Sequence, residues 1–178
     1  RQTTNFRTAE FDLDSVYGNG PTGSPELYDT SSGDIKFKVE AISGSEQVSR
    51  KGAQLFDLPR DANNNAIIAD SRNDENLLIS QFHLAMLKFH NAVVDRLRED
   101  PANATRSAQD LFKEALQQVR WHYQWIVLNE FLPLAIGQNR VDEILRNGPR
   151  FYRVHDRTHD SIFRSPRREP LIPVEFAV

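Results

Sequence analysis

The feature that most constrains the fold is a long run of apolar residues at helical spacing in the middle of the chain. Between about Asn73 and Glu99, apolar side chains recur at steps of three and four residues, which is the period of an α-helix. This stripe consists of Leu78, Phe82, Ala85, Phe89 and Val93, and other faces carry Leu77, Leu84, Leu87, Val94 and Leu97. Ser71 and Asp74 fit a capping-box variant at its start. A helix that is apolar on several sides is covered by protein, so this segment predicts a core element.

A second stretch, from about Ser107 to Phe131, predicts another helix that packs against the first. Its apolar and aromatic positions are Leu111, Ala115, Val119, Trp121, Tyr123, Trp125 and Ile126. Pro133 cannot continue a helix, so we expect this one to end before it. A shorter helix is predicted from Val141 to Arg146, closed by Gly148.

The region from Arg1 to about Asn65 is rich in Gly, Pro, Ser, Asn and Asp and has little helical periodicity, which predicts loops and short extended pieces. The stretch Gly33–Val39 alternates apolar and charged residues and predicts a short, peripheral strand. Gly18, Gly20 and Gly23 match the spacing of the dinucleotide fingerprint, but no hydrophobic strand precedes them. We therefore interpret these glycines as a structural turn.

Composition excludes several classes of function. The net charge of −3 and the pI of about 6.0 leave no basic field that would attract nucleic acid or anionic lipid. No apolar stretch approaches the roughly 20 residues of a membrane span, so we expect none. The absence of cysteine excludes disulfides, zinc thiolate sites and thiol catalysis, and it names no compartment.

Oxygen-bearing side chains alternate near the start of the chain, at Thr8, Glu10, Asp12 and Asp14. In an extended loop these groups point to one side, while Phe11 and Leu13 point to the other. Calcium takes six to eight oxygen ligands, so such a loop could supply several of them. A polar strand or cap is the alternative, and the residues alone favour it because the sequence has no EF-hand loop.

His83 and His90 are seven residues apart on the first predicted helix, so they lie on nearly one stripe. Such a pair could bind a metal or a haem iron. Buried histidines are more often core residues that are hydrogen-bonded to a neighbouring group, and we favour that role for both. The same interpretation applies to His122, which lies between two aromatic residues.

Four stretches of the chain occur in an order that is typical of one family. They are the loop Phe11–Gly18, the segment Ile67–Asn76 leading into the helix with His83 and His90, the aromatic stretch Trp121–Val127 with Phe131–Pro133, and the end of the chain at Ile172–Val178. In that order they resemble the calcium loop, the distal-arginine segment, the next core helix and the start of the proximal helix of animal-type haem peroxidases, the superfamily that includes the cyclooxygenases. The resemblance covers essentially the whole chain, and its style is closer to the bacterial members.

The resemblance implies roles for two residues beside the haem. Arg72 matches the family's distal arginine. A fixed, always protonated guanidinium there stabilises the negative charge that forms on the departing oxygen when peroxide is cleaved. Glu75 matches a glutamate that some members esterify to a haem methyl, and the spacing of three puts both side chains on one face. Asn76 stands where some members have a methionine linked to the haem, so that link is not expected.

The resemblance also implies two bound groups. One is haem b, with an ester through Glu75 as an option. The other is Ca²⁺, held by the side chains of Thr8, Asp12 and Asp14 and by the backbone carbonyl of Glu10. On this basis the calcium interpretation is preferred to the polar-loop one. The three histidines named above keep a structural role, because none matches the family's iron ligand.

The family's remaining catalytic groups are expected outside this sequence. Its distal histidine and the neighbouring aspartate belong to a segment before Arg1, and its proximal histidine falls about two turns after Val178. An iron without its axial nitrogen and a peroxide site without its base cannot complete the usual cycle. We therefore expect the 178-residue chain alone to be inactive and the remaining segments of the domain, which could form another chain, to be its partner.

The expected fold is mainly α, with a haem-peroxidase-like helical core and a long loop-rich N-terminal segment, as a fragment of a larger domain. Residues 1–178 would be the central part of one peroxidase domain. Within it, 1–65 would hold the calcium loop and irregular structure, 66–135 the two long core helices, and 136–178 loops and the start of the proximal helix.

The expected function is reduction of hydrogen peroxide at haem b with oxidation of a second, unidentified substrate. One alternative is a fatty-acid dioxygenase of the same superfamily, which uses the haem to form a tyrosyl radical. Another is a calcium-stabilised interaction module without catalysis. The resemblance favours a secreted or extracytoplasmic location.

Overall fold

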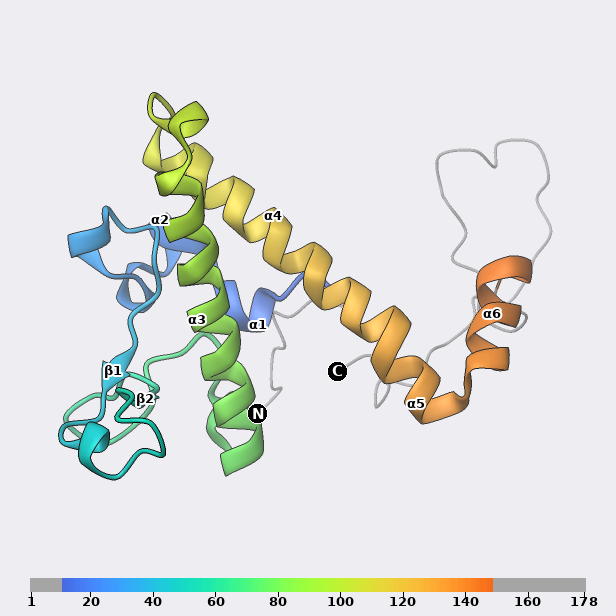
Figure 1. Cartoon of the computed structure of the whole chain (residues 1–178), viewed down its shortest axis with the longest axis horizontal. Helices are drawn as coiled ribbons and strands as arrows, with labels where there is room; N and C mark the ends of the chain where they lie inside the picture. Colours follow the sequence, from blue (N-terminus) through green and yellow to red (C-terminus); the bar gives the residue numbers. More distant parts are fainter. Residues whose placement is uncertain (1–10, 149–178) are drawn as a thin grey trace, which may run out of the picture. The chain divides into compact units, whose positions relative to one another are not determined.

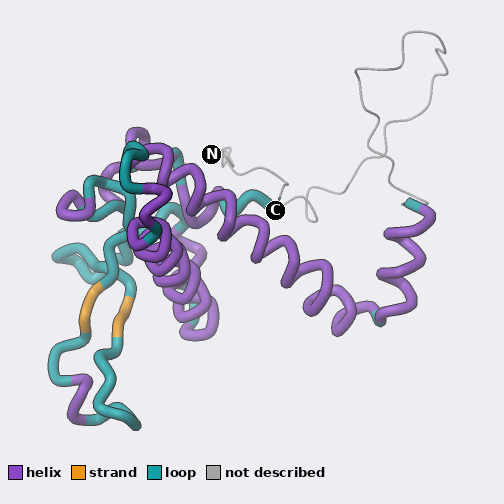
Figure 2. The backbone as a smooth tube through the Cα atoms, turned by 45° about the horizontal axis from the view of Figure 1, so that its top comes forward, coloured by secondary structure: helices purple, strands orange, loops and turns teal. Residues whose placement is uncertain are grey.

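The computed structural model describes residues 11–148, which belong to two compact units divided after Tyr123. The described elements of the first unit are α1 (Asp14–Tyr17), α2 (Gly20–Gly23), β1 (Glu40–Ala41), β2 (Phe56–Asp57), α3 (Leu77–Glu99) and most of α4 (Ala108–Ile126), with 3-10 helices at Pro25–Leu27, Thr30–Ser32, Ser45–Gln47, Ser71–Asp74 and Pro101–Asn103. Helices dominate over strands in Figure 2, so the prediction of a mainly α fold is confirmed.

The first long helix starts later than its apolar pattern suggested. The chain first forms the 3-10 helix η4 (Ser71–Asp74), then becomes extended at Asn76, with φ −149° and ψ 162°. The Asn76 side chain accepts a hydrogen bond from the Ile79 amide at 3.1 Å and caps α3. The capping-box prediction for Ser71 and Asp74 is therefore wrong, because an asparagine closer to the helix caps it instead.

The backbone of α1 lies beside α3 in the first unit (Figure 1). The core there contains an aromatic cluster that joins the N-terminal segment to both long helices, with the rings of Tyr17, Tyr28, Phe37, His90 and Phe112. Tyr28 stacks on Phe37 with 4.7 Å between ring centroids, and His90 meets Phe112 edge-on at 5.5 Å. The predicted packing of α3 with α4 thus depends on rings from the N-terminal loops as well as on the helices.

The predicted strand Gly33–Val39 does not form, and the stretch is not peripheral, because two of its apolar side chains belong to the core. Ile35 and Phe37 are buried and the intervening lysine is partly exposed. Phe37 makes a single antiparallel bridge to Tyr28, so no continuous ladder extends the pattern. The paired strands are instead β1 and β2, which are antiparallel and two residues long.

The second unit is described over residues 124–148. After α4, a π-helical turn (Val127–Phe131) leads into α5 (Leu132–Ile136), and α6 (Gln138–Asn147) follows. The prediction that the helix ends before Pro133 is wrong. The proline lies in the first turn of α5, where the lack of an amide hydrogen costs little, and Gly137 at φ 86° interrupts the helix instead. The predicted closure of α6 by Gly148 is confirmed, and the predicted proximal helix lies outside the described residues.

Gly18 provides the first test of this packing. It ends α1 at φ 56°, and an added Cβ would lie 2.8 Å from Ser24 Oγ and 3.2 Å from Leu27 Cδ1. We expect Gly18→Ala to lower the free energy of unfolding by about 2–4 kcal/mol, from left-handed strain and from overpacking. Gly20→Ala is the matched control, because Gly20 has φ 74° but open space around it. It should lose only about 1 kcal/mol. Equal losses in urea unfolding would contradict the packing described here.

Candidate functional site

The turn η4 carries Arg72, and a buried carboxylate, that of Asp70, holds the Arg72 side chain. Asp70 caps the turn, with Oδ1 accepting from the Arg72 amide at 3.1 Å. The Arg72 side chain returns to the same carboxylate, donating from Nε to Oδ1 at 3.0 Å and from Nη2 to Oδ2 at 2.7 Å. The Asp70 side chain is 9% exposed and that of Arg72 is 54% exposed. A buried acid therefore fixes the guanidinium while much of its surface remains accessible.

This pairing keeps Arg72 charged. The hydrogen bonds to Asp70 raise the pKa of the Arg72 guanidinium above its already high value. Only Nε and Nη2 are used by Asp70, and Nη1 has no hydrogen-bond partner within residues 11–148. A guanidinium has five N–H donors, so several remain for an anionic or polarised group outside the protein.

The far end of the same turn is held by Arg60. Its Nη1 donates to Asp74 Oδ2 at 2.8 Å and its Nη2 donates to Asp74 Oδ1 at 3.0 Å. The hydrogen bond from Arg60 lowers the pKa of the Asp74 carboxyl below its usual range. Asp74 was predicted to cap α3 and instead forms this ion pair.

Asn73 links the turn to α3 and to α1. Its Nδ2 lies 2.9 Å from His83 Nδ1 and 3.4 Å from the Ser15 carbonyl oxygen. Because the asparagine amide is a donor, His83 Nδ1 accepts and the ring proton lies on Nε2. His83 Nε2 is buried and has no partner within the described chain. Burial lowers the pKa of His83 to about 4, so the ring is neutral at pH 7.

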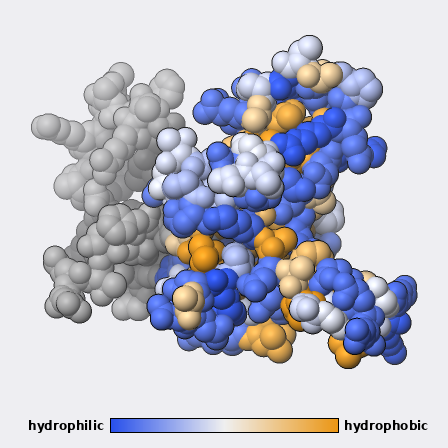
Figure 3. Space-filling model, turned by 90° about the vertical axis from the view of Figure 1, so that its left-hand side faces the viewer, coloured by the Kyte–Doolittle hydropathy of each residue, from blue (hydrophilic) through white to orange (hydrophobic). Residues whose placement is uncertain are grey.

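Apolar side chains are exposed next to this turn, at the start of α3. Leu77 is 74% exposed, Leu78 is 82% exposed and Phe82 is 53% exposed. Figure 3 shows hydrophobic side chains at the surface among hydrophilic ones on the face that it draws. Exposed apolar groups of this size next to a fixed cation are typical of a surface that another group covers.

Glu75 follows the turn directly and is exposed, as is Arg72. The two side chains are three residues apart, and the turn between them is 3-10, in which positions i and i+3 are eclipsed. A haem needs an apolar contact surface and polar groups at its rim. The exposed leucines, Arg72 and Glu75 fit that requirement.

The predicted calcium loop is described only in part, since Thr8 and Glu10 lie outside the described residues. Asp12 Oδ1 accepts from the Asp14 amide at 3.1 Å, and Arg120 Nε donates to the Asp12 carbonyl oxygen at 2.9 Å. The loop is not extended throughout, because Leu13 has φ 61° and α1 begins at Asp14. Within residues 11–148, no three His, Cys, Asp or Glu side chains gather as a metal site. The ligand set stays a prediction.

The other histidines have structural surroundings. His90 is fully buried, with Nδ1 at 3.0 Å from the Tyr17 hydroxyl and Nε2 at 2.9 Å from the Ile35 carbonyl oxygen. The predicted core role of His90 is confirmed. His122 is exposed rather than buried, and its Nδ1 lies 2.7 Å from the Gln118 carbonyl oxygen.

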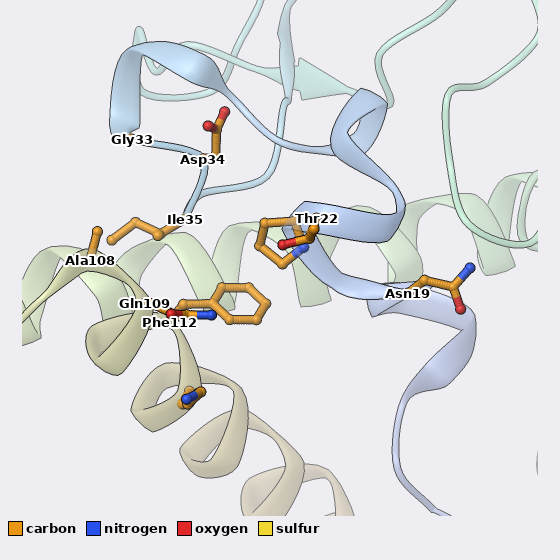
Figure 4. Close-up of a pocket in the computed structure, with 10 residues that line it drawn as sticks. Asn19, Thr22, Gly33, Asp34, Ile35, Ala108, Gln109 and Phe112 are labelled. Atoms are coloured by element: carbon orange, nitrogen blue, oxygen red, sulfur yellow. The ribbon is translucent and has the colours of Figure 1, made fainter.

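A separate hollow of about 620 Å³ lies where α2 and the Gly33–Ile35 loop face the start of α4 (Figure 4). Ile35 and Phe112 contribute apolar side chains to its lining, and Asn19, Asp34 and Gln109 contribute polar ones. Arg72 and Glu75 do not line this hollow. The glycines of the fingerprint-like motif form the turns beside it and Gly18 and Gly20 have positive φ, in agreement with the predicted structural turn.

Sequence reasoning missed the residues that hold Arg72. Asp70 carries a local signal, since an aspartate two residues before the arginine fits an Asx-type cap. Arg60 and His83 carry none, because their contacts with the turn join positions 14 and 10 residues apart through tertiary structure.

The family assignment agrees with this arrangement. A family model described as "Animal haem peroxidase" matches residues 1–176. The chain belongs to the animal haem peroxidase family. This peroxidase-family chain is 22% identical over 153 residues to a Peroxidasin homolog of Caenorhabditis briggsae, and the match covers 82% of the chain and 12% of the relative. It is 24% identical over 152 residues to Peroxidasin homolog pxn-2 of Caenorhabditis elegans, with 82% of the chain and 11% of that relative covered.

The chain thus spans about an eighth or less of the length of these curated relatives. No solved structure matches the peroxidase-family chain. None of the helices within residues 11–148 is long and apolar enough to cross a membrane.

Proposed function

We propose that this chain is the central part of a peroxidase domain and that the complete protein reduces hydrogen peroxide at haem b while oxidising a second substrate. The observation that supports this best is the setting of Arg72. It lies in the segment that resembles the family's distal-arginine segment, it is fixed by the buried Asp70, and its guanidinium is half exposed beside apolar side chains. The partners of the chain are then hydrogen peroxide, a reducing substrate and the remaining segments of the domain.

The chemistry assigned to Arg72 is electrostatic. Cleavage of the O–O bond of peroxide places negative charge on the departing oxygen, and a preorganised cation stabilises that charge. Asp70 holds the guanidinium in one orientation, so little reorganisation is needed when the charge forms. The same carboxylate partly offsets the positive charge, and the donors that do not face Asp70 are the ones assigned to peroxide.

Haem b supplies the iron at which peroxide is reduced, and this chain supplies part of its surroundings. Glu75 is assigned to the porphyrin rim because it is exposed, three residues from Arg72 and next to the apolar surface of Leu77 and Leu78. An ester between Glu75 and a haem methyl is part of the proposal. Asn76 is used for capping α3, which gives it a structural role at this edge.

The proposed function is tested on the complete protein. Haemin is titrated into it while the Soret absorbance is recorded, and the consumption of hydrogen peroxide is then measured with a phenolic reductant. We expect a saturable Soret change and peroxide consumption well above that of free haemin. Failure to bind haemin, or consumption equal to that of free haemin, would contradict the proposal.

The 178-residue chain alone is expected to have no turnover above free haemin, because the axial ligand and the distal base are assigned to other segments. Guaiacol oxidation by the purified chain with haemin is the measurement. Oxidation well above the haemin blank would show that residues within this chain can replace those groups, and the assignment would then be wrong.

We also propose a calcium site at Thr8, Glu10, Asp12 and Asp14 that stabilises the fold. These oxygens are part of a six-to-eight-ligand shell, and a carboxylate beside the distal histidine would complete it. A ligand that binds only the folded state stabilises it by about 2.7 kcal/mol at 100 times its dissociation constant. Calcium should therefore raise the melting temperature of the complete protein, and Asp12→Ala should abolish the rise.

The calcium prediction is measured as a difference between melts in calcium and in chelator. That difference separates the loss of the ion from the loss of the hydrogen bond between Asp12 and the Asp14 amide. Asp34→Ala, which removes an exposed carboxylate elsewhere, is the control and should keep the full calcium effect. A calcium-dependent rise that survives Asp12→Ala would contradict the site.

A further inference from the structure

The turn that carries Arg72 is held at both ends by ion pairs, and only one of them includes Arg72 itself. We propose that Arg60 and Asp74 form a positioning pair for Arg72, which keeps the η4 turn in place so that the guanidinium has one orientation toward peroxide. This inference rests on the proposed function of Arg72.

The geometry of the pair is specific. Two parallel N–H···O bonds, of 2.8 and 3.0 Å, join the Arg60 fork to both oxygens of Asp74. The side chains are 24% and 25% exposed, so both are largely shielded from solvent. A bidentate arginine–carboxylate pair fixes the relative orientation of two planes, which a single contact does not.

Arg60 is itself held by the loop that follows β2. Its backbone makes an antiparallel bridge to Ala66, and its Nη1 also donates to the Asn64 carbonyl oxygen at 3.1 Å. The neighbouring Leu58 is fully buried in the core. The loop therefore presents Arg60 to Asp74 from a defined position.

The turn needs support of this kind. It is a four-residue 3-10 helix, followed by the extended Asn76, so it is not a continuous part of α3. Short 3-10 segments have poor hydrogen-bond geometry and depend on their surroundings. Asp70 holds the first residues of the turn and Arg60 holds its last residue, Asp74. Arg72 lies between these two carboxylates in the sequence.

If the Arg60–Asp74 pair only stabilised the fold, its removal would have a different effect on the reaction with peroxide. Partly exposed ion pairs add little to stability, so a variant without the pair is expected to fold. If the pair positions Arg72, its removal slows the peroxide reaction, and the slowing disappears when Arg72 is already absent. If the pair only stabilises the fold, any effect on the reaction is independent of Arg72.

The test is a double-mutant cycle in the complete, haem-loaded protein, with the second-order rate of reaction with hydrogen peroxide followed at the Soret band. We expect Arg60→Ala to slow this reaction roughly 10- to 100-fold, as misplacement of a catalytic group by about 1 Å does. Arg60→Lys should lie between Arg60→Ala and the parent, since lysine keeps the charge without the fork. In the Arg72→Ala background, Arg60→Ala should have no further effect.

Arg140→Ala is the matched control, because it removes another arginine–carboxylate pair, that with Glu143 at 2.9 Å in α6. It should leave the rate unchanged. Asp74→Asn removes the charge of the other partner in the Arg60–Asp74 pair. It replaces Arg60→Ala in the cycle if Arg60→Ala does not fold. Hydrogen exchange of peptides covering Ser71–Glu75 is a readout that does not depend on activity, and it should be faster in Arg60→Ala than in Arg140→Ala.

The outcomes distinguish a failure of the proposed function from a failure of the positioning pair alone. If Arg72→Ala has no effect on the rate, the proposed function fails and the positioning pair fails with it. If Arg72→Ala slows the reaction and Arg60→Ala slows it equally with and without Arg72, only the positioning pair is overturned. Unchanged exchange of Ser71–Glu75 in Arg60→Ala would also overturn it.

Discussion

Arg72→Ala is expected to slow the reaction of the complete, haem-loaded protein with hydrogen peroxide by about 100- to 1,000-fold, the usual cost of losing one preorganised donor at a developing anion. The loss should appear in the peroxide step and not in haem binding, because the apolar surface of Leu77 and Leu78 is unchanged. Arg72→Lys should recover only part of the rate. Its ammonium keeps the charge but lacks the planar fork that holds both oxygens of Asp70 and directs the other donors away from them.

The measurement is stopped-flow absorbance at the Soret band over a range of peroxide concentrations. Arg140→Ala is again the control for a general loss of positive charge, and it should react like the parent. A rate for Arg72→Ala within about threefold of the parent would show that the guanidinium does not act on peroxide. Arg72 would then be a surface residue that is paired with Asp70, the residue that caps its turn.

The second large effect is a loss of stability as the pH falls from about 6.5 to 4. Burial lowers the pKa of both His83 and His90 to about 4 in the folded chain, and an unfolded histidine has a pKa of about 6.5. Between these values the unfolded state binds more protons. The stabilisation is therefore complete above pH 6.5 and is lost as the pH approaches 4. Each histidine should account for about 2 kcal/mol at pH 5.

The surroundings of the two rings support this direction. His90 faces the Tyr17 hydroxyl and the Ile35 carbonyl oxygen, of which only the carbonyl favours the charged ring, and burial outweighs it. His83 faces Asn73, and the nearby Asp70 only partly opposes the effect of burial.

Urea unfolding at pH 7.5, 6 and 5, followed by circular dichroism, measures the effect. His90→Gln should flatten the dependence by about half while lowering stability at every pH. A free energy of unfolding that is constant from pH 7.5 to 5 would show that the rings are not buried in their neutral form.

The helical part of the fold could be predicted because its information is local. The apolar periods of α3 and α4 and the glycine after α6 lie within single segments, so the sequence indicates them directly. The wrong predictions of helix ends occur where a local rule points to one residue and a neighbouring residue or turn takes that role instead. Asn76 caps α3 in place of Ser71, and Pro133 lies in the first turn of α5 because a π-helical turn precedes it.

The candidate site could be predicted only in part, for a related reason. Arg72 and Glu75 were identified through a resemblance, and periodicity alone would have left them as ordinary surface residues. The groups that hold the turn come from segments that the fold brings together, Arg60 from the loop after β2 and His83 from α3. Contacts of that kind have no fixed spacing in the sequence. The proposed calcium ligands alternate along the sequence, yet Thr8 and Glu10 lie outside the described residues.

Arg72 and Glu75 are proposed to face a haem. A crystal structure of the complete, haem-loaded protein with cyanide bound tests this most directly, since cyanide occupies the place of peroxide. We expect Arg72 to keep its contacts with Asp70, to direct its remaining donors toward the distal face of the haem, and to have Glu75 beside it at the porphyrin rim. An Arg72 that is paired only with Asp70 and remote from the haem, with Glu75 in solvent, would contradict the claim.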